Sequence, residues 1–172
     1  MAYRIIDGSF QEKPFSHSIY HIISCPSQGA TVFAPLTELI ERLDDSKRQF
    51  WERLYMASDR RGNCVHPHIY PHPLTKLPTL CFHLGMTDHY VLDGKLLDEE
   101  ATEEIKAGIH EEFVKNNGDI QYVHEWQPGD FLISDNLALG HEAAPETQLS
   151  TSHVGLRVMH RVTIAGKHQP RK

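Results

Sequence analysis

The sequence contains few cysteines, and this scarcity excludes two classes of small protein. Cys25, Cys64 and Cys81 are the only 3 cysteines among 172 residues, and no CxxC motif is present. Their wide spacing argues against a disulfide scaffold and against a zinc site made of cysteines alone. We therefore expect three buried, unreactive thiols, which is the usual state of a free cysteine.

The sequence also has no long run of apolar residues and no cluster of lysines and arginines. Without a stretch of about 18 apolar residues the sequence predicts no membrane-spanning helix. Residues 1–10 do not form a basic-then-apolar signal sequence, so a cytoplasmic location is expected. A net charge of −6 argues against nucleic acid and against an anionic membrane as partners.

What is present is a β-rich pattern with helices on one side. Runs of β-branched and aromatic residues predict strands at residues 5–6, 17–25, 30–34, 80–84, 121–126, 131–134 and 156–164. Helical spacing predicts helices over residues 35–58, split near Ser46 as an N-cap, and over residues 98–115, ended by Asn-Asn-Gly. Residues 26–29 predict a turn and residues 60–79 a proline-rich loop. Residues 1–172 suffice for one domain, and a mainly β jelly-roll, or double-stranded β-helix, fits this pattern.

Two residues far apart in the chain have the chemistry of metal ligands. Asp7 leaves the first predicted strand into the sequence Gly-Ser-Phe, and His141 stands just past the apolar run that begins at Phe131. A mononuclear Fe(II) site takes two histidines and one carboxylate on one face and leaves the opposite positions open. The alternative is that Asp7 only caps a turn, because Asp-Gly is a common turn pair.

The last predicted strand carries two arginines, Arg157 and Arg161. Side chains four residues apart on a strand point to the same face, so both can reach one pocket, while His160 points away from it. A guanidinium holds a carboxylate through two parallel hydrogen bonds, which lysine cannot do. The alternative is a solvated strand face on which the arginines pair with Glu142 or Glu146.

Histidine is frequent, with 13 residues, but only His66, His68 and His72 form a cluster. A His-x-His pair with a third histidine four residues on can clamp zinc or nickel if its loop is rigid. The simpler interpretation is structural, because prolines fix an extended path through this segment.

Three segments together resemble the taurine dioxygenase-like (TauD/TfdA) branch of the Fe(II)/2-oxoglutarate-dependent oxygenases. Residues 4–33 are similar to the segment that holds the family's His-x-Asp motif and its Gly-x-Thr-x-Phe turn. Residues 66–82 are similar to its His-Pro-rich stretch, with Lys76 where a glycine is usual, and residues 122–164 to its C-terminal block. Asp7-Gly8 and residues 129–141, GDFLISDNLALGH, are closer to the isonitrile-pathway oxygenases of this branch.

The resemblance implies a role for each candidate residue. Asp7 and His141 would bind Fe(II), and Thr31 would donate a hydrogen bond to a carboxylate of 2-oxoglutarate. Arg157 would form a salt bridge with the same co-substrate, and Arg161 would face an anionic group of the primary substrate. The implied fold is a clavaminate synthase-like jelly-roll with flanking helices.

One position departs from the family pattern. Ile5 stands where the first histidine of His-x-Asp belongs, and isoleucine cannot bind a metal. Full-length relatives also carry a sizeable N-terminal region before this motif, so the chain matches the C-terminal part of the usual domain, and an incomplete jelly-roll is one expectation. Water or a neighbouring histidine would then have to complete the metal shell.

Two functions follow from the resemblance, and a third follows from the histidine cluster. The first is a non-haem Fe(II)/2-oxoglutarate-dependent dioxygenase that hydroxylates or desaturates a small organic substrate while 2-oxoglutarate is decarboxylated to succinate. The second is an inactive remnant of this fold that binds a small carboxylate through Thr31 and Arg157. The third is a metal-dependent enzyme of the cupin type that uses residues 66–72. Apolar surface left uncovered in an incomplete domain would favour a homo-oligomer.

Overall fold

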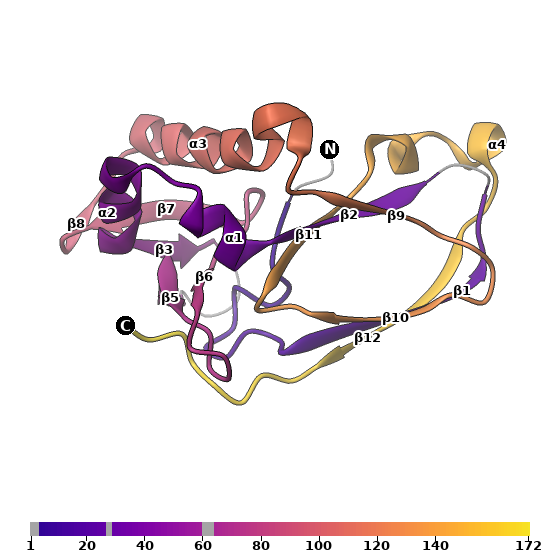
Figure 1. The fold of residues 1–172 in the computed structure, drawn as a ribbon, viewed down its shortest axis with the longest axis horizontal. Coiled ribbons are helices and arrows are strands. Elements are labelled where there is room, and N and C mark those ends of the chain that lie inside the picture. The colour runs from indigo at the N-terminus through magenta and orange to yellow at the C-terminus, as the bar shows by residue number, and fades with distance from the viewer. Residues whose placement is uncertain (1–3, 27–28, 60–63) are drawn as a thin grey trace.

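Two facing antiparallel sheets form one half of the molecule (Figure 1). The structure is a computed structural model that describes residues 4–26, 29–59 and 64–172. One sheet has the order β10-β1-β12 and the other the order β11-β2-β9. The strands are β1 (His17–Ser24), β2 (Ala30–Pro35), β9 (Tyr122–Glu125), β10 (Phe131–Asp135), β11 (Leu139–Ala143) and β12 (Val158–Ile164). Two one-turn helices, the 3-10 helix η1 (Pro145–Gln148) and α4 (Thr151–Val154), lie between β11 and β12. The two layers form the predicted mainly β jelly-roll.

Alternation along β1 decides which side chains line the space between the sheets. Ser18, Tyr20 and Ile22 are buried, and the residues between them are half-buried. Because β12 pairs with β1 in register, Arg161 lies opposite Tyr20 and is directed to the same interior. His160, one residue earlier, lies on the outer face opposite His21, as predicted.

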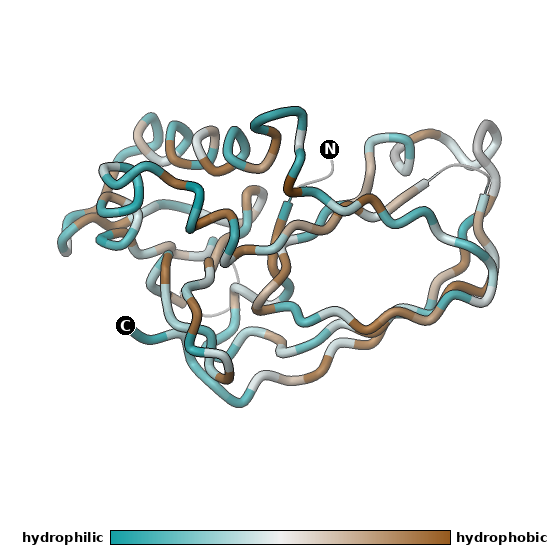
Figure 2. Tube along the Cα trace, viewed as in Figure 1, coloured by the Kyte–Doolittle hydropathy of each residue, from teal (hydrophilic) through white to brown (hydrophobic). Residues whose placement is uncertain are grey.

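The other half of the molecule packs helices against a second group of strands (Figure 1). The helices are α1 (Leu36–Glu41), α2 (Asp45–Arg53) and α3 (Glu99–Gly118). They contact a β4-β3-β7-β8 sheet and a β5-β6 ribbon, built from β3 (Leu54–Ser58), β4 (Val65–Pro67), β5 (Ile69–Pro71), β6 (Pro78–Leu80), β7 (Thr87–Leu92) and β8 (Lys95–Leu96). The largest apolar core lies among these elements, and Figure 2 shows apolar segments recurring along α3.

The helical prediction over residues 35–58 is confirmed in its division into two helices, but it is wrong for residues 54–58. It is split into α1 and α2, but the N-cap of α2 is Asp44, which accepts a hydrogen bond from Lys47 N at 2.8 Å, rather than Ser46. Residues 54–58 form β3 instead of helix. Pairing with β4 on one side and β7 on the other overrides the local helical spacing there.

The second predicted helix is confirmed as α3. Asp98 caps it by accepting a hydrogen bond from Ala101 N at 2.9 Å. Its regular part ends where Asn116 and Asn117 take positive φ angles of 52° and 60°, as the Asn-Asn-Gly sequence predicts. None of the helices in the described ranges is both long and apolar enough to cross a membrane.

Several short strands differ from the prediction. The segment predicted as a loop contains β4, β5 and β6, while the predicted strand at 80–84 is reduced to the end of β6 and one bridge at His83. β7, β8 and β11 are not predicted, because β8 has only two residues while β7 begins with three polar residues and β11 contains a glycine and two polar residues. Residues 27–28 of the predicted turn and 60–63 of the predicted loop lie outside the described residues.

The cysteine prediction is correct for one residue and wrong for two. All three thiols are free, but only Cys81 is buried, while Cys25 and Cys64 are half-buried. Burial raises the pKa of Cys81 and of Cys64, so neither thiol is activated towards the thiolate.

Candidate functional site

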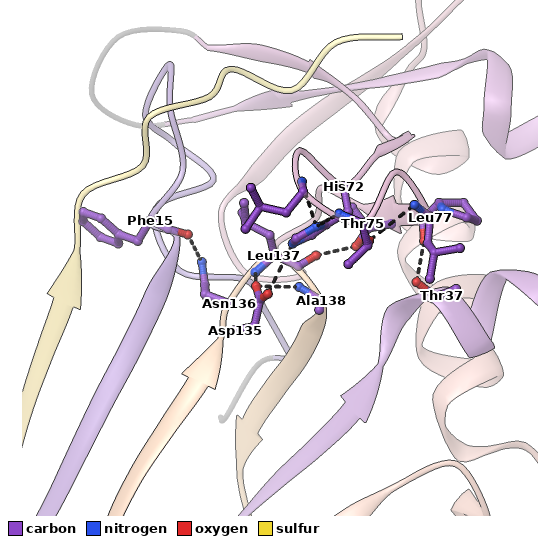
Figure 3. A network of polar contacts seen from close by, with 12 residues as sticks. Phe15, Thr37, His72, Thr75, Leu77, Asp135, Asn136, Leu137 and Ala138 are labelled. Atoms are coloured by element: carbon purple, nitrogen blue, oxygen red, sulfur yellow. Dashed lines mark hydrogen bonds and ion pairs between the residues drawn. The ribbon is translucent and has the colours of Figure 1, made fainter.

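Asp7 lies in a buried turn that one amide side chain holds in place. Asn136 accepts a hydrogen bond from Asp7 N at 2.7 Å and donates to Asp7 O at 2.9 Å and to Phe15 O at 2.7 Å. Figure 3 shows the Asn136 amide directed at Phe15. Gly8 follows with a φ of +75°, and a Cβ atom there would lie 2.8 Å from the Phe15 ring, so glycine is required.

The turn between β10 and β11 is fixed by the polar network drawn in Figure 3. Asp135 Oδ1 accepts hydrogen bonds from Leu137 N at 3.0 Å and from Ala138 N at 3.2 Å. The other carboxylate oxygen of Asp135 lies 3.3 Å from His72 Nε2. This network fixes where β11 begins and therefore where His141 stands on it.

His141 and Asp7 come together inside the fold. Ile5 and His141 exchange two backbone hydrogen bonds of 2.9 and 3.0 Å, which makes them a directly opposed antiparallel pair. His141 Nε2 lies 3.5 Å from Asp7 Oδ2, and the two residues are 7% and 5% exposed. The two residues that the sequence singles out as metal ligands are therefore neighbours in the interior.

Arg161 reaches the same carboxylate from the opposite sheet. Its Nη2 donates to Asp7 Oδ1 at 2.7 Å, while the Ser18 hydroxyl donates to Asp7 Oδ2 at 2.9 Å. The partner of Arg161 is thus Asp7, and neither of the glutamates considered from the sequence. Glu142 pairs with the buried Arg4 instead.

Thr31 and Arg157 lie near a cavity rather than in contact with Asp7. The Thr31 hydroxyl accepts a hydrogen bond from Trp126 Nε1 at 2.9 Å. A Cβ atom at Gly29 would lie 3.0 Å from Arg157 Nη2, so the guanidinium passes close to that backbone. Gly29, Ala30 and Trp126 line a cavity of about 570 Å³. Thr31 and Arg157, the two residues expected to bind the co-substrate, therefore both lie close to residues that line this cavity at the start of β2.

The histidine cluster at residues 66–72 does not converge. His66 Nε2 bonds Gln11 O at 2.8 Å and His68 Nδ1 bonds Cys81 O at 3.1 Å. His72 joins the network around the turn after β10. Each of the three rings has a separate structural partner, which favours the structural interpretation over a zinc or nickel site.

Burial keeps the imidazoles beside Asp7 neutral near pH 7. It lowers the pKa of His141, an effect that the Asp7 charge opposes and the Arg161 charge reinforces. It also lowers the pKa of His83 to about 4. Burial raises the pKa of Tyr20, and the Asp7 charge is the second cause. A neutral imidazole keeps the lone pair that a metal ligand needs.

Several polar atoms in the interior make no hydrogen bond and are candidates for contact with a ligand. His141 Nε2, Tyr20 Oη and Ser134 Oγ are buried and have no hydrogen-bond partner among the described residues. Buried polar groups are normally satisfied, so such atoms are where an ion, water or ligand belongs. Asp7 and His141 are donors of the type that Fe(II) uses. The pair fits a divalent metal, although in the described ranges no three His, Cys, Asp or Glu side chains already converge on one point.

Comparison with known proteins identifies the family of this chain. The chain belongs to the taurine catabolism dioxygenase TauD, TfdA family, whose model matches residues 6–163. It is 27% identical to a 3-((Z)-2-isocyanoethenyl)-1H-indole synthase of Fischerella ambigua, over 86% of this chain and 59% of the relative. It is 28% identical to a tyrosine isonitrile desaturase of Erwinia amylovora, over 82% of this chain and 50% of the relative. The chain thus spans between half and three fifths of the length of these two curated relatives.

A solved structure supports the same fold. The crystal structure of AAD-2 in complex with Mn(II) and N-oxalylglycine matches with a TM-score of 0.78 at 19% identity, over 98% of this chain and 70% of that chain. The jelly-roll expected from the sequence is therefore confirmed. The family is one of dioxygenases, and a further relative, 23% identical over 80% of this chain and 36% of the relative, is an alpha-ketoglutarate-dependent sulfonate dioxygenase of Saccharomyces cerevisiae.

The sequence assigns no role to four residues around Asp7. Ser18 and Tyr20 read only as members of a strand, and Asn136 is one residue of the block at residues 129–141. His83 stands in the apolar sequence LCFHLG. Period-two alternation along β1 would have placed Ser18 and Tyr20 on one face, but only the register with β12 brings that face to Asp7.

Proposed function

We propose that the protein is an Fe(II)/2-oxoglutarate-dependent dioxygenase that hydroxylates or desaturates a small organic substrate. The convergence of Asp7 and His141 carries this proposal, because His141 Nε2 lies 3.5 Å from the carboxylate and makes no hydrogen bond in the described part of the chain. These two residues would hold the metal. Bound Fe(II) would supply the redox chemistry, in which dioxygen decarboxylates 2-oxoglutarate to succinate and carbon dioxide while the substrate is oxidised.

Thr31 and Arg157 would bind and orient the co-substrate. The Thr31 oxygen already accepts a hydrogen bond from Trp126, which leaves the hydroxyl hydrogen to be donated to a carboxylate. Arg157 passes beside Gly29, where the missing side chain leaves its guanidinium accessible to an anionic group. Two parallel hydrogen bonds from that planar group would fix the carboxylate in one orientation.

The walls of the interior would exclude water and select the substrate. Tyr20 packs against Phe33 and Trp126, with ring centroids 6.3 and 5.8 Å apart. Arg161 would leave Asp7 when a cation binds there and would then face an anionic group of the substrate. The names of the two curated relatives, an isocyanoethenyl-indole synthase and a tyrosine isonitrile desaturase, favour an isonitrile derived from an aromatic amino acid as the substrate class.

A second candidate is an inactive remnant of the fold that binds a small carboxylate through Thr31 and Arg157. Two observations favour it. Ile5 contributes no metal donor, and Arg161 already neutralises Asp7 at 2.7 Å. In this case the carboxylate would bind without any metal.

Anaerobic addition of Fe(II) and 2-oxoglutarate to the protein, beside an Ile5→His variant, tests the two candidates. The visible charge-transfer band of the chelated complex should form in both proteins, and succinate should form when dioxygen is admitted. A band in Ile5→His alone, together with metal-independent binding of 2-oxoglutarate to the parent by calorimetry, would identify the remnant.

A further inference from the structure

A buried histidine lies beside the position where the family's first metal ligand is missing. Ile5 is bridged on one side by His141 and on the other by His83. Backbone hydrogen bonds of 3.2 and 3.3 Å flank the Ile5–His83 pair. Such a pair is of the non-hydrogen-bonded kind, in which opposed Cβ atoms approach within about 4.5–5.5 Å. His83, Ile5 and His141 therefore project from three adjacent segments to one face.

We propose that His83 completes the metal site in place of the missing histidine, together with Asp7 and His141. The inference rests on the proposed function, because it requires a metal at Asp7. Both imidazoles are longer than the isoleucine side chain between them, so their nitrogens can meet above it. The resulting set of two histidines and one carboxylate is the one that mononuclear Fe(II) oxygenases use.

The backbone around His83 is held firmly enough to support a ligand. His83 O accepts hydrogen bonds from Met86 N at 3.2 Å, from Thr87 N at 3.0 Å and from the Thr87 hydroxyl at 2.8 Å. His83 is only 7% exposed, so few rotamers are open to it. A rigid backbone keeps the His83 ring within reach of the site, so that rotation of the side chain alone has to bring its nitrogen to the metal.

One existing contact must be exchanged when His83 binds a metal. Gly85 N donates to His83 Nδ1 at 3.1 Å, which leaves Nε2 as the nitrogen that can turn to the site. Coordination through Nε2 places the ring hydrogen on Nδ1, so the Gly85 hydrogen bond is lost. One hydrogen bond is given up for a metal–nitrogen bond. Because the metal-free protein makes that hydrogen bond, these three donors do not already converge in the described part of the chain.

A double-variant comparison tests the assignment. Fe(II) is titrated anaerobically in the presence of 2-oxoglutarate, and the charge-transfer band gives the apparent Kd of the parent, His83→Gln, Ile5→His and the Ile5→His/His83→Gln double variant. His83→Gln should raise the Kd at least tenfold in the parent and less than twofold when Ile5→His supplies the usual ligand. His66→Gln, a buried histidine with its own partner outside the site, serves as the matched control and should leave the Kd unchanged.

The outcomes separate the ligand assignment from the proposed function. A band in the parent that His83→Gln does not weaken overturns the role of His83 and leaves the dioxygenase proposal intact. No band in the parent overturns both. If His83→Gln does not fold, the nitric oxide adduct of the parent decides by electron–nuclear double resonance: two histidine nitrogens on the iron support the assignment, and one overturns it.

Discussion

Asp7 has an internal cation as partner, and any metal must compete with it. Arg161 donates to one carboxylate oxygen at 2.7 Å and Ser18 to the other at 2.9 Å. The Arg161 side chain is 43% exposed, whereas that of Asp7 is 6% exposed. The guanidinium can therefore move into solvent while the carboxylate stays where it is. The ion pair stabilises the metal-free fold and at the same time weakens metal binding.

Replacing Arg161 by glutamine should strengthen metal binding and destabilise the metal-free protein. A partly exposed ion pair contributes about 0.5–1 kcal/mol, so its removal should raise the affinity for Co(II) by about two- to fivefold. Co(II) absorption titration and thermal unfolding with and without metal measure the two effects. Arg42→Gln, which removes an exposed pair with Asp119 away from the site, is the control. Unchanged or weaker Co(II) binding by Arg161→Gln would contradict the competition.

Buried histidines make the stability of the protein depend on pH. Burial lowers the pKa of His68 from 6.5 to about 4, and His83 is lowered to a similar value. The unfolded chain therefore binds more protons than the folded one below pH 6.5, so stability is complete above that pH and is lost as the pH falls towards 4.

Replacing His68 by phenylalanine should remove part of this dependence. The shift of His68 corresponds to on the order of 3 kcal/mol when both states are fully protonated. His68 packs between Trp51 and Tyr90 with ring centroids 5.2 and 5.4 Å away, so another aromatic ring fits the space. Urea unfolding between pH 4.5 and 7.5 should give a shallower slope than in the parent but not a flat one, because burial also lowers the pKa of His66, His83 and His141. An identical slope in the two proteins would disprove the assignment.

The sequence could identify single residues that stand in a motif, but it could not show which side chains contact one another in the fold. Asp7 and His141 stand in recognisable surroundings, a strand that ends in Asp-Gly and a histidine after an apolar run. The contact between Arg161 and Asp7 depends on the register of β12 with β1, which no local pattern encodes. No local pattern encodes the position of His83 either, because one isolated β-bridge brings it next to Ile5.

At the scale of elements, β11 carries His141 into a tightly packed position. Gly140, one residue earlier, faces the main core. A Cβ atom there would lie 3.0 Å from Phe82 Cζ, 3.1 Å from Leu36 Cδ2 and 3.3 Å from Phe113 Cζ. Three rigid or buried neighbours leave little room for relaxation.

Gly140→Ala should destabilise the protein, whereas Gly108→Ala should stabilise it. Overpacking of a core position costs about 1–3 kcal/mol, which lowers the melting temperature by about 2–4 °C per kcal/mol in a chain of this size. Gly108 lies in α3 with nothing within 4 Å of an added Cβ atom, and alanine is the better helix former by about 1 kcal/mol. Calorimetry of the two variants checks both signs. A Gly140→Ala protein as stable as the parent would mean that β11 can shift, and with it His141.

Elements were predictable where local signals agree with tertiary packing. α3 has an apolar period and an Asn-Asn-Gly stop signal, and both are confirmed, while its Asp98 cap is a finding of the structure. Residues 54–58 have helical spacing, but β4 and β7 pair with them on both sides and make them a strand. β11 has a glycine and two polar residues among its five, so only its pairing with β2 identifies it as a strand.

At the scale of the whole molecule, the β10-β1-β12 sheet has one apolar face turned to solvent. Phe131, Ile133, Val162 and Ile164 are 64%, 61%, 56% and 42% exposed. Ile133 and Val162 flank Ile19 in one row, and Phe131 lies beside His21 in the next. A contiguous apolar face on a sheet favours association, because isolated apolar residues are common on surfaces but clusters are not.

We expect this face to join two copies of the chain in a reversible dimer. Sedimentation velocity should show a concentration-dependent shift towards the dimer, and Ile133→Lys/Val162→Lys should hold the protein in the monomer with its circular dichroism unchanged. Leu74→Lys is the matched control, since Leu74 is 72% exposed but lies outside this sheet, after β5. The Leu74→Lys protein should therefore dimerise at the same concentration as the parent. A parent that sediments only as a monomer at high concentration would refute the dimer. Loss of the dimer in all variants alike would show that charge, and not this face, controls association.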